Sequence, residues 1–165
     1  MNILVLCTGN SARSIIAETL LNDIGKGQLT AFSAGSAPAS MPNPFALKVL
    51  ADNGHDTARA RSKSWHEFSG ADAPVMNVVI TVCANAAGEV CPIWPGHPTT
   101  AHWGVADPAR LTGTDAEKLA AFESCYLEMK TRIEAFYEGG INSQNAPMRA
   151  RQIEMRFPDS QMITD

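Results

Sequence analysis

The first 24 residues constrain the fold most, because a strand-like run changes to a helix-like pattern across one short polar loop. Residues 2–6 form an apolar run, which is typical of a strand buried on both faces of a sheet. Further along, Ile16, Leu20 and Ile24 recur at i, i+4 and i+8 and predict an amphipathic helix over 14–24. A buried strand followed by a helix indicates a domain in which strands and helices alternate.

The alternation continues as far as residue 138. Pro44 suits the first turn of a helix over 44–53, and Thr114 suits the N-cap of a long helix over 114–138. The other expected elements are strands over 28–34, 77–82 and 99–103 and a short helix over 64–69. We therefore predict an α/β fold with a four-stranded parallel sheet flanked by helices on both faces, in a Rossmann-like three-layer α/β/α arrangement.

The length and composition fit one domain. The chain has 165 residues, of which 45% are hydrophobic, so it can bury a single core. We predict one domain over residues 1–140, followed by a polar extension over 141–165 that is either loose or strapped over the domain. Three methionines of this extension are expected to pack loosely, namely Met148, Met155 and Met162.

The charge balance excludes several classes of partner. With 13 Lys and Arg against 17 Asp and Glu, the net charge is -4, so we expect no nucleic-acid partner. No apolar run approaches about 20 residues, which predicts no membrane span, and the amino terminus lacks the basic region of a signal peptide. We therefore expect a cytoplasmic monomer whose four cysteines are thiols used for metal binding, catalysis or packing.

The loop from Cys7 to Ser14 is the most informative motif. It joins a strand to a helix, where α/β sheets bind ligands and where backbone N–H groups and the helix dipole attract an oxyanion. The same field would lower the pKa of Cys7, and the planar fork of Arg13 can bind two oxyanion oxygens. Ser14 can donate its hydroxyl to the thiolate, and Asn10 tolerates a left-handed backbone. The predicted oxyanion-binding residues are Thr8, Gly9, Asn10, Ser11, Ala12, Arg13 and Ser14.

Asp107, followed by Pro108, is a second candidate for chemistry. A carboxylic acid beside the oxyanion can protonate a leaving oxygen. An isolated Asp-Pro pair more often forms only a turn, and an isolated cysteine such as Cys7 more often only packs. The presence of both motifs in one chain favours the catalytic interpretation.

These motifs resemble a known family. The Cys-x5-Arg-Ser loop at the first strand–helix turn and Asp107-Pro108 before the last helix are similar to the low-molecular-weight tyrosine phosphatases, over about residues 1–138. The resemblance implies a phosphatase-like catalytic domain. By itself it leaves open a phosphatase or one of the arsenate reductases that share this fold.

Two further cysteines follow the strand over 77–82. Cys83 lies directly after this strand, at the sheet edge expected to carry Cys7, and Cys91 follows after seven intervening residues. A disulfide requires Cα atoms within about 7 Å, so pairing these thiols calls for movement. Two buried structural thiols and a zinc site that uses His97 and His102 are alternatives, but zinc would favour closer cysteine pairs. We predict no metal and no cofactor.

The spacing of these cysteines, followed by His102-Trp103-Gly104, is similar to thioredoxin-coupled arsenate reductases. The phosphatases carry a second cysteine just before the loop arginine, where this chain has Ala12. The resemblance implies that Cys7 attacks arsenic while Asp107 helps water to leave. Cys83 then attacks Cys7 and releases arsenite, and Cys91 attacks Cys83 to form the final disulfide.

The implied activity is arsenate reduction for arsenic detoxification, with phosphate or sulfate as substrate mimics. A thioredoxin or a glutaredoxin-type donor would reduce the final disulfide. The alternatives are a tyrosine or small-molecule phosphatase that uses Cys7, Arg13 and Asp107, and an oxyanion-binding module without turnover. Cys125, in the last long helix, is expected only to pack.

Some relatives bind potassium beside the loop through Asn, Glu, Ser and Asp side chains. Asn10, Glu18 and Ser33 match three of these positions, and Lys63 takes the fourth. A lysine ammonium can replace the cation, so we predict no potassium requirement.

Overall fold

The computed structural model describes residues 1–160 and contains a four-stranded parallel sheet in the order β2-β1-β3-β4. The strands are β1 (Asn2–Leu6), β2 (Thr30–Ala34), β3 (Val78–Thr81) and β4 (Thr99–His102). In the register of the sheet, Leu6 lies opposite both Ala34 and Thr81, so neighbouring strands end at one edge. The chain order reverses between β1 and β3, and ligands of α/β proteins bind in the crevice at such a point.

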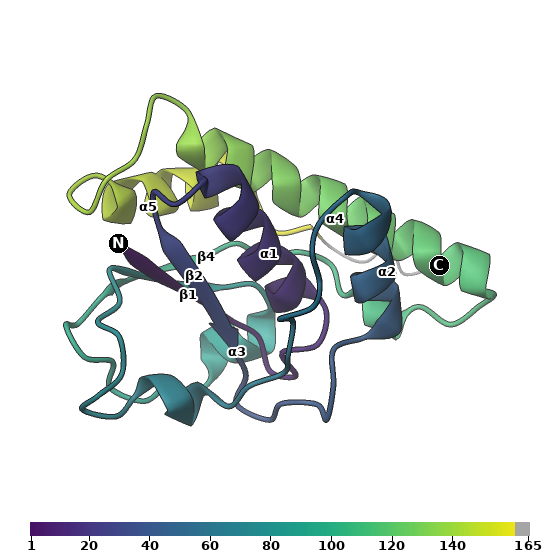
Figure 1. Ribbon diagram of the computed structural model, residues 1–165, viewed down its shortest axis with the longest axis horizontal. Helices are drawn as coiled ribbons and strands as arrows, with labels where there is room; N and C mark the ends of the chain where they lie inside the picture. The colour runs from purple at the N-terminus through teal and green to yellow at the C-terminus, as the bar shows by residue number, and fades with distance from the viewer. Residues whose placement is uncertain (161–165) are drawn as a thin grey trace.

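The long helices gather on one side of the sheet (Figure 1). They are α1 (Arg13–Gly25), α2 (Pro44–Asp52), α4 (Asp115–Tyr137) and α5 (Ala146–Arg156). The other face is covered by a 3-10 helix at Trp65–Phe68 and a loop that carries Trp94. Two short helices follow the ends of β3 and β4, namely α3 (Ala84–Gly88) and a 3-10 helix at Pro108–Arg110.

Local chemistry explains where the predicted helices begin. The Asn43 side chain accepts a hydrogen bond of 2.9 Å from the Phe45 N–H and so caps α2. Thr114 and Glu117 form a reciprocal capping box at the start of α4. The fold class, the sheet and these helices confirm the sequence prediction, although the helices divide unequally between the two faces.

Helix α5 was not predicted, because its buried face consists mainly of small side chains. Ala146, Ala150 and Ile153 pack into the main core, while arginines occupy the exposed side of α5. The helix contacts β3, β4 and α4, so this part of the extension packs against the domain and is not loose. The division of the chain at residue 140 stays a prediction.

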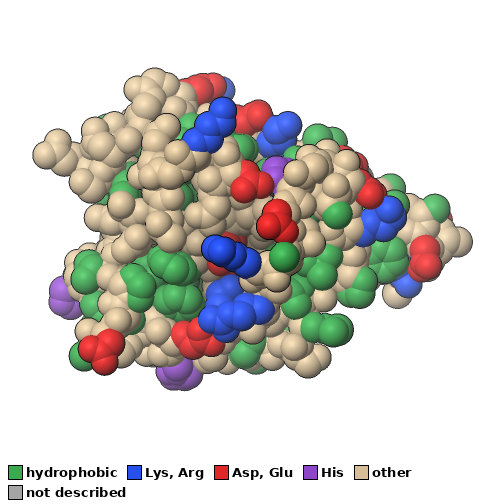
Figure 2. Space-filling model, in the orientation of Figure 1, with side chains coloured by type: hydrophobic (Ala, Val, Ile, Leu, Met, Phe, Trp, Pro, Cys, Tyr) green, Lys and Arg blue, Asp and Glu red, His purple; other side chains and the backbone are tan. Residues whose placement is uncertain are grey.

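The exposed methionines Met148 and Met155 agree with loose packing, whereas Met162 lies outside the described residues. Within residues 1–160, no helix combines the length and apolarity needed to cross a membrane. On the face shown in Figure 2, basic and acidic side chains are interspersed.

Candidate active site

The loop between β1 and α1 presents its amide groups to a cavity. The carbonyl groups of Thr8, Gly9 and Ser11 accept hydrogen bonds of 2.8 to 3.0 Å from the N–H groups of residues 37, 39 and 43. Because a trans peptide directs its N–H away from its carbonyl, the next amides point toward the opposite, concave side. The loop thus lines the cavity beside the amino terminus of α1, and its binding of an oxyanion stays a prediction.

The Asn10 side chain holds this loop in place through buried hydrogen bonds. Asn10 is fully buried with a left-handed φ of 42°, as its predicted role requires. Its amide donates 2.9 Å hydrogen bonds to the hydroxyls of Ser14 and Ser33, and its Oδ1 accepts from the Lys63 N–H at 2.7 Å. Ser14 thus contacts Asn10, and within residues 1–160 no hydrogen bond joins it to Cys7.

Gly35 supports the loop from the end of β2, a role that the sequence prediction missed. A Cβ built on Gly35 would lie 2.3 Å from the Thr8 carbonyl oxygen and 2.8 Å from that of Cys7. Only glycine allows this close approach of two backbones. The available signal was a glycine placed directly after the second strand.

Arg13 and Asp107 lie together although 94 residues separate them. Arg13 donates to Asp107 Oδ2 at 2.8 Å and to the Val105 carbonyl at 3.0 Å. The buried Nε of Arg13 has no hydrogen-bond partner within residues 1–160, which leaves a donor for an oxyanion. Asp107 Oδ1 also accepts from the Ala109 N–H at 3.1 Å, so this residue both caps a turn and faces the loop.

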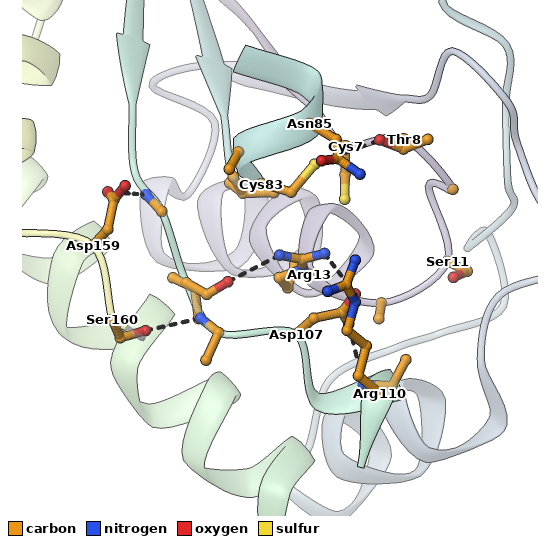
Figure 3. Close-up of a pocket in the computed structure, with 18 of the residues that line it drawn as sticks. Cys7, Thr8, Ser11, Arg13, Cys83, Asn85, Asp107, Arg110, Asp159 and Ser160 are labelled. Atoms are coloured by element: carbon orange, nitrogen blue, oxygen red, sulfur yellow. Dashed lines mark hydrogen bonds and ion pairs between the residues drawn. The ribbon is translucent and has the colours of Figure 1, made fainter. Parts of the chain in front are cut away.

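The side chains of Cys7 and Cys83 both face the cavity, and each thiol shifts the pKa of the other (Figure 3). The Cys7 side chain is the main cause that lowers the pKa of Cys83 to about 5. A hydrogen bond from the Ala86 N–H to Cys83 Sγ adds to the effect. The neighbouring Cys83 side chain and burial raise the pKa of Cys7, whereas the charge of Arg13 lowers it.

These opposite pKa shifts favour the thiolate on Cys83 and the thiol on Cys7. This differs from the expectation that the loop alone makes Cys7 a thiolate. Transfer of the proton from Cys7 to Cys83 makes Cys7 the nucleophile.

Cys91 does not meet Cys83 in this structure. Cys83 belongs to the core on the helix-covered face, whereas half-buried Cys91 packs against the core that contains Trp94 on the other face. Burial and nearby Glu89 raise the pKa of Cys91. All four cysteines are free, and burial raises the pKa of Cys125 to about 12, in agreement with a packing role.

A cavity of about 440 Å³ opens over the loop. Of the predicted site residues, Cys7 to Arg13, Cys83 and Asp107 line it, while Ser14 and Cys91 do not. Among the polar lining residues, sequence reasoning missed Asn85, Arg110, Asp159 and Ser160, and it considered His102 as an alternative zinc ligand. Among the residues that the structure describes, those that line this cavity include no Phe, Tyr or Trp.

Lys63 lies where the sequence comparison placed it. Its ammonium is 3.2 Å from Glu18 Oε2, 3.4 Å from the Ser33 hydroxyl and 3.0 Å from the Arg61 carbonyl oxygen. The buried ammonium thus occupies the space among the residues that would hold a cation. In the described part of the chain, no group of three or more His, Cys, Asp or Glu is arranged to hold a metal ion.

The parallel sheet, the cysteine-arginine oxyanion loop and the facing carboxyl group define the phosphatase-like class of α/β proteins. Residues 2–146 match the family of low molecular weight phosphotyrosine protein phosphatases. The chain therefore belongs to this family, as the motifs indicated.

The relatives include both activities that the resemblance left open. The chain is 36% identical over 138 residues to the arsenate reductase of Bacillus subtilis, across 82% of this chain and 94% of that protein. The thioredoxin-dependent arsenate reductase of Corynebacterium glutamicum is 25% identical with a TM-score of 0.54, across 81% of this chain and 61% of that one. A low molecular weight phosphotyrosine phosphatase of Vibrio cholerae has a TM-score of 0.64 over 86% of this chain and 99% of its own, and at 21% identity it shows the fold alone.

Proposed function

We propose that this protein is an enzyme that reduces arsenate to arsenite with electrons from its own cysteines, and so serves arsenic detoxification. The observation that carries the proposal is that Cys83 lines the same cavity as Cys7, at the base of the oxyanion loop, where each thiol shifts the pKa of the other. Phosphorus(V) and arsenic(V) form oxyanions of the same shape, but thiols reduce only the arsenic. A second thiol beside the nucleophile supplies the electrons that this reduction needs.

The first step joins substrate to Cys7. The loop amides and Arg13 hold arsenate, and the Cys7 thiolate attacks arsenic to form an S–As bond. One arsenate oxygen leaves as water after Asp107 delivers a proton. The Arg13–Asp107 contact of 2.8 Å supports this role, because it holds the carboxyl group at the mouth of the loop.

The second step transfers the electrons. The Cys83 thiolate attacks Cys7 Sγ, so that an S–S bond forms and the S–As bond breaks. Both electrons of the broken bond stay on arsenic, which leaves as arsenite in the trivalent state. Cys83 first releases to solvent the proton that it took from Cys7. The Ala86 N–H and the Thr8 hydroxyl, 3.4 and 3.7 Å from Cys83 Sγ, also lower the pKa of Cys83 and remain in place when Cys7 carries arsenic, so they support this attack.

The third step needs a movement. Cys83 is the N-cap of α3, and its sulfur accepts the Ala86 N–H at 3.4 Å. A disulfide sulfur is a weaker acceptor than a thiolate, so bonding Cys83 to Cys7 removes this cap and loosens the one-turn helix. Cys91 can then leave its apolar site, where burial raises its pKa, and attack Cys83 as a thiolate.

The last attack forms the Cys83–Cys91 disulfide and frees the Cys7 thiolate. A dithiol protein then returns two electrons. Val90 and Ile93 flank Cys91 with 96% and 80% of their surfaces exposed, and such apolar residues suit a docking partner. We assign this role to a thioredoxin, in line with the relative from Corynebacterium glutamicum, rather than to a glutaredoxin-type donor. We further propose a cytoplasmic monomer.

The alternative activity is hydrolysis of phosphotyrosine or a small phosphate ester. Cys7, Arg13 and Asp107 are sufficient for it, and the family as a whole favours it. An aryl phosphate, however, gains affinity by stacking its ring on aromatic side chains. Within the described chain, the residues that line this cavity include no Phe, Tyr or Trp, which favours the small inorganic oxyanion.

Arsenate-dependent oxidation of NADPH, coupled through thioredoxin and its reductase, tests the proposal. Cys7→Ser, Cys83→Ser and Cys91→Ser should each abolish turnover, while Cys125→Ala should keep it as a matched control. Loss of aryl phosphate hydrolysis in Cys7→Ser alone, without arsenate turnover in the wild type, would establish the phosphatase instead.

A further inference from the structure

The residues after α5 contact the site, although they lie beyond the family match, which ends at residue 146. The Ala106 N–H donates to Ser160 Oγ at 2.8 Å, and the Gly104 N–H donates to Asp159 Oδ1 at 3.2 Å. The Ser160 N–H in turn donates to the Gly104 carbonyl at 3.2 Å. Figure 3 shows Asp159 and Ser160 side by side along this loop.

These contacts complete a sheet edge. The N–H groups of Trp103 and Val105 donate to the carbonyls of Thr81 and Val82, so the segment 103–106 continues β4 alongside the end of β3. The amides of the alternate residues, 104 and 106, then point toward the open side. Without the carboxy-terminal segment, this side would be an unpaired sheet edge.

The segment is itself firmly anchored. Buried Arg132 of α4 donates 3.1 Å hydrogen bonds to the carbonyls of both Gly104 and Pro158. It thereby links the loop after β4 to the segment after α5. A Cβ on Gly104 would lie 2.3 Å from the Asp159 carboxylate, which shows how closely they approach. His102 Nε2 lies 3.2 Å from Asp159 Oδ2 and adds an anchor on β4.

The loop held in this way carries the groups that face the oxyanion cradle. Val105 lies between Gly104 and Ala106, whose amides are hydrogen-bonded in this way, and its carbonyl oxygen accepts a hydrogen bond of 3.0 Å from Arg13. Asp107 follows directly after Ala106 and pairs with the same arginine. A displacement of residues 104–106 would therefore move both the arginine and the carboxyl group.

We propose that Asp159 and Ser160 act as positioning residues, which clamp the segment Gly104–Asp107 so that Arg13 and Asp107 keep their places at the oxyanion. The proposal rests on the proposed function, because it assigns the clamp to the reaction in which Asp107 delivers a proton. Misplacing a catalytic group by about 1 Å can reduce turnover by about a hundredfold. Replacing either Asp159 or Ser160 should therefore lower kcat about tenfold.

Amide hydrogen exchange of the full-length protein, followed by NMR, tests the clamp without substrate. Ser160→Ala should speed exchange at the Ala106 amide, and Asp159→Ala should do so at the Gly104 amide. The Val105 amide, which donates to Val82 at 3.3 Å, should stay protected in both variants and serves as the internal reference. Ser143→Ala, an exposed serine in the turn before α5, is the matched control.

Turnover tests the positioning role in the same variants. Ser160→Ala and Asp159→Ala should lower kcat for arsenate about tenfold with KM unchanged, and Ser143→Ala should match the wild type. Asp159→Asn should restore most of kcat, because its amide oxygen still accepts the Gly104 N–H.

Unchanged exchange at Gly104 and Ala106 would overturn the clamp, and so would increased exchange with normal kcat. Failure of the proposed function has a different signature, because the wild type itself would then turn over no arsenate. In that case hydrolysis of an aryl phosphate, which uses the same Asp107, replaces arsenate as the readout. Equal hydrolysis by the wild type and Ser160→Ala would then overturn the positioning role.

Discussion

The cysteine of the oxyanion loop and the two relay cysteines occupy opposite kinds of structure. The loop around Cys7 is fixed by buried Asn10, by the Lys63 amide and by the close approach of Gly35. The segment from Cys83 to Cys91 contains a single turn of helix and ends in exposed apolar side chains. The difference matches the chemistry, because holding an oxyanion requires fixed donors, whereas passing a disulfide between three sulfurs requires movement.

The largest effect is expected from breaking the fixed region. Gly35→Ala would place a methyl group 2.3 Å from the Thr8 carbonyl oxygen, so the loop must shift. We expect a loss of roughly 3 kcal/mol in the free energy of unfolding, together with loss of arsenate turnover. Urea denaturation measures the first and the coupled NADPH assay the second. Gly70→Ala is the control, since nothing lies within 4 Å of its Cβ; equal stability of the two variants would contradict the rigid loop.

The link between the two regions can be removed with Cys7→Ala. The thiol of Cys7 is the main cause that lowers the pKa of Cys83 to about 5, so this pKa should rise toward the ordinary thiol value. In the wild type, Cys83 should stay reactive until the pH falls through about 5, whereas in the variant its reactivity should fall at higher pH. Alkylation rates of Cys83 at a series of pH values, read by mass spectrometry, measure both curves. An unchanged midpoint would show that Cys7 does not lower the pKa of Cys83.

A smaller effect is expected from stiffening the segment from Cys83 to Cys91, which the proposed reaction requires to move. Gly88→Ala adds a methyl group at the end of α3, with nothing within 4 Å, and should stabilise its helical form by about 0.5 to 1 kcal/mol. If α3 must open before Cys91 attacks, formation of the Cys83–Cys91 disulfide should slow about two- to fivefold. Rapid acid quenching after one turnover measures that rate. Faster or equal disulfide formation would indicate that Cys91 reaches Cys83 with α3 intact.

No effect is expected from exchanging the monovalent cation around the fixed region. The Lys63 ammonium, 3.2 Å from Glu18, already supplies the positive charge beside the loop. Arsenate turnover should therefore be equal in potassium and in sodium at the same ionic strength. Strong activation by potassium would contradict this assignment.

The sequence allowed the fixed region to be predicted better than the segment from Cys83 to Cys91. Strand periodicity and the Cys-x5-Arg spacing place Cys7 and Arg13 at the end of a buried strand, and both depend on local order along the chain. The opposite pKa shifts of Cys7 and Cys83 depend on the proximity of residues far apart in the chain. The start of α3 was missed because a cysteine sulfur, which is not a usual capping group, caps it.

The carboxy-terminal contacts were beyond sequence reasoning for another reason. Asp159 and Ser160 follow a helix whose buried face is made mainly of alanines, so neither the helix nor its end had a clear signal. Their side chains accept hydrogen bonds from the backbone amides of residues 104 and 106. Because nearly every residue type has a backbone N–H, the sequence gives no sign of which residues are the partners.

The central claim is that Cys83 attacks the arsenic adduct of Cys7, so that the two thiols are oxidised to a disulfide and arsenic receives their two electrons. It is tested most directly by treating Cys91→Ser with one equivalent of arsenate and mapping the disulfides by peptide mass spectrometry. The account predicts that a Cys7–Cys83 disulfide accumulates together with one equivalent of arsenite. No disulfide, or one that joins other cysteines, would contradict it.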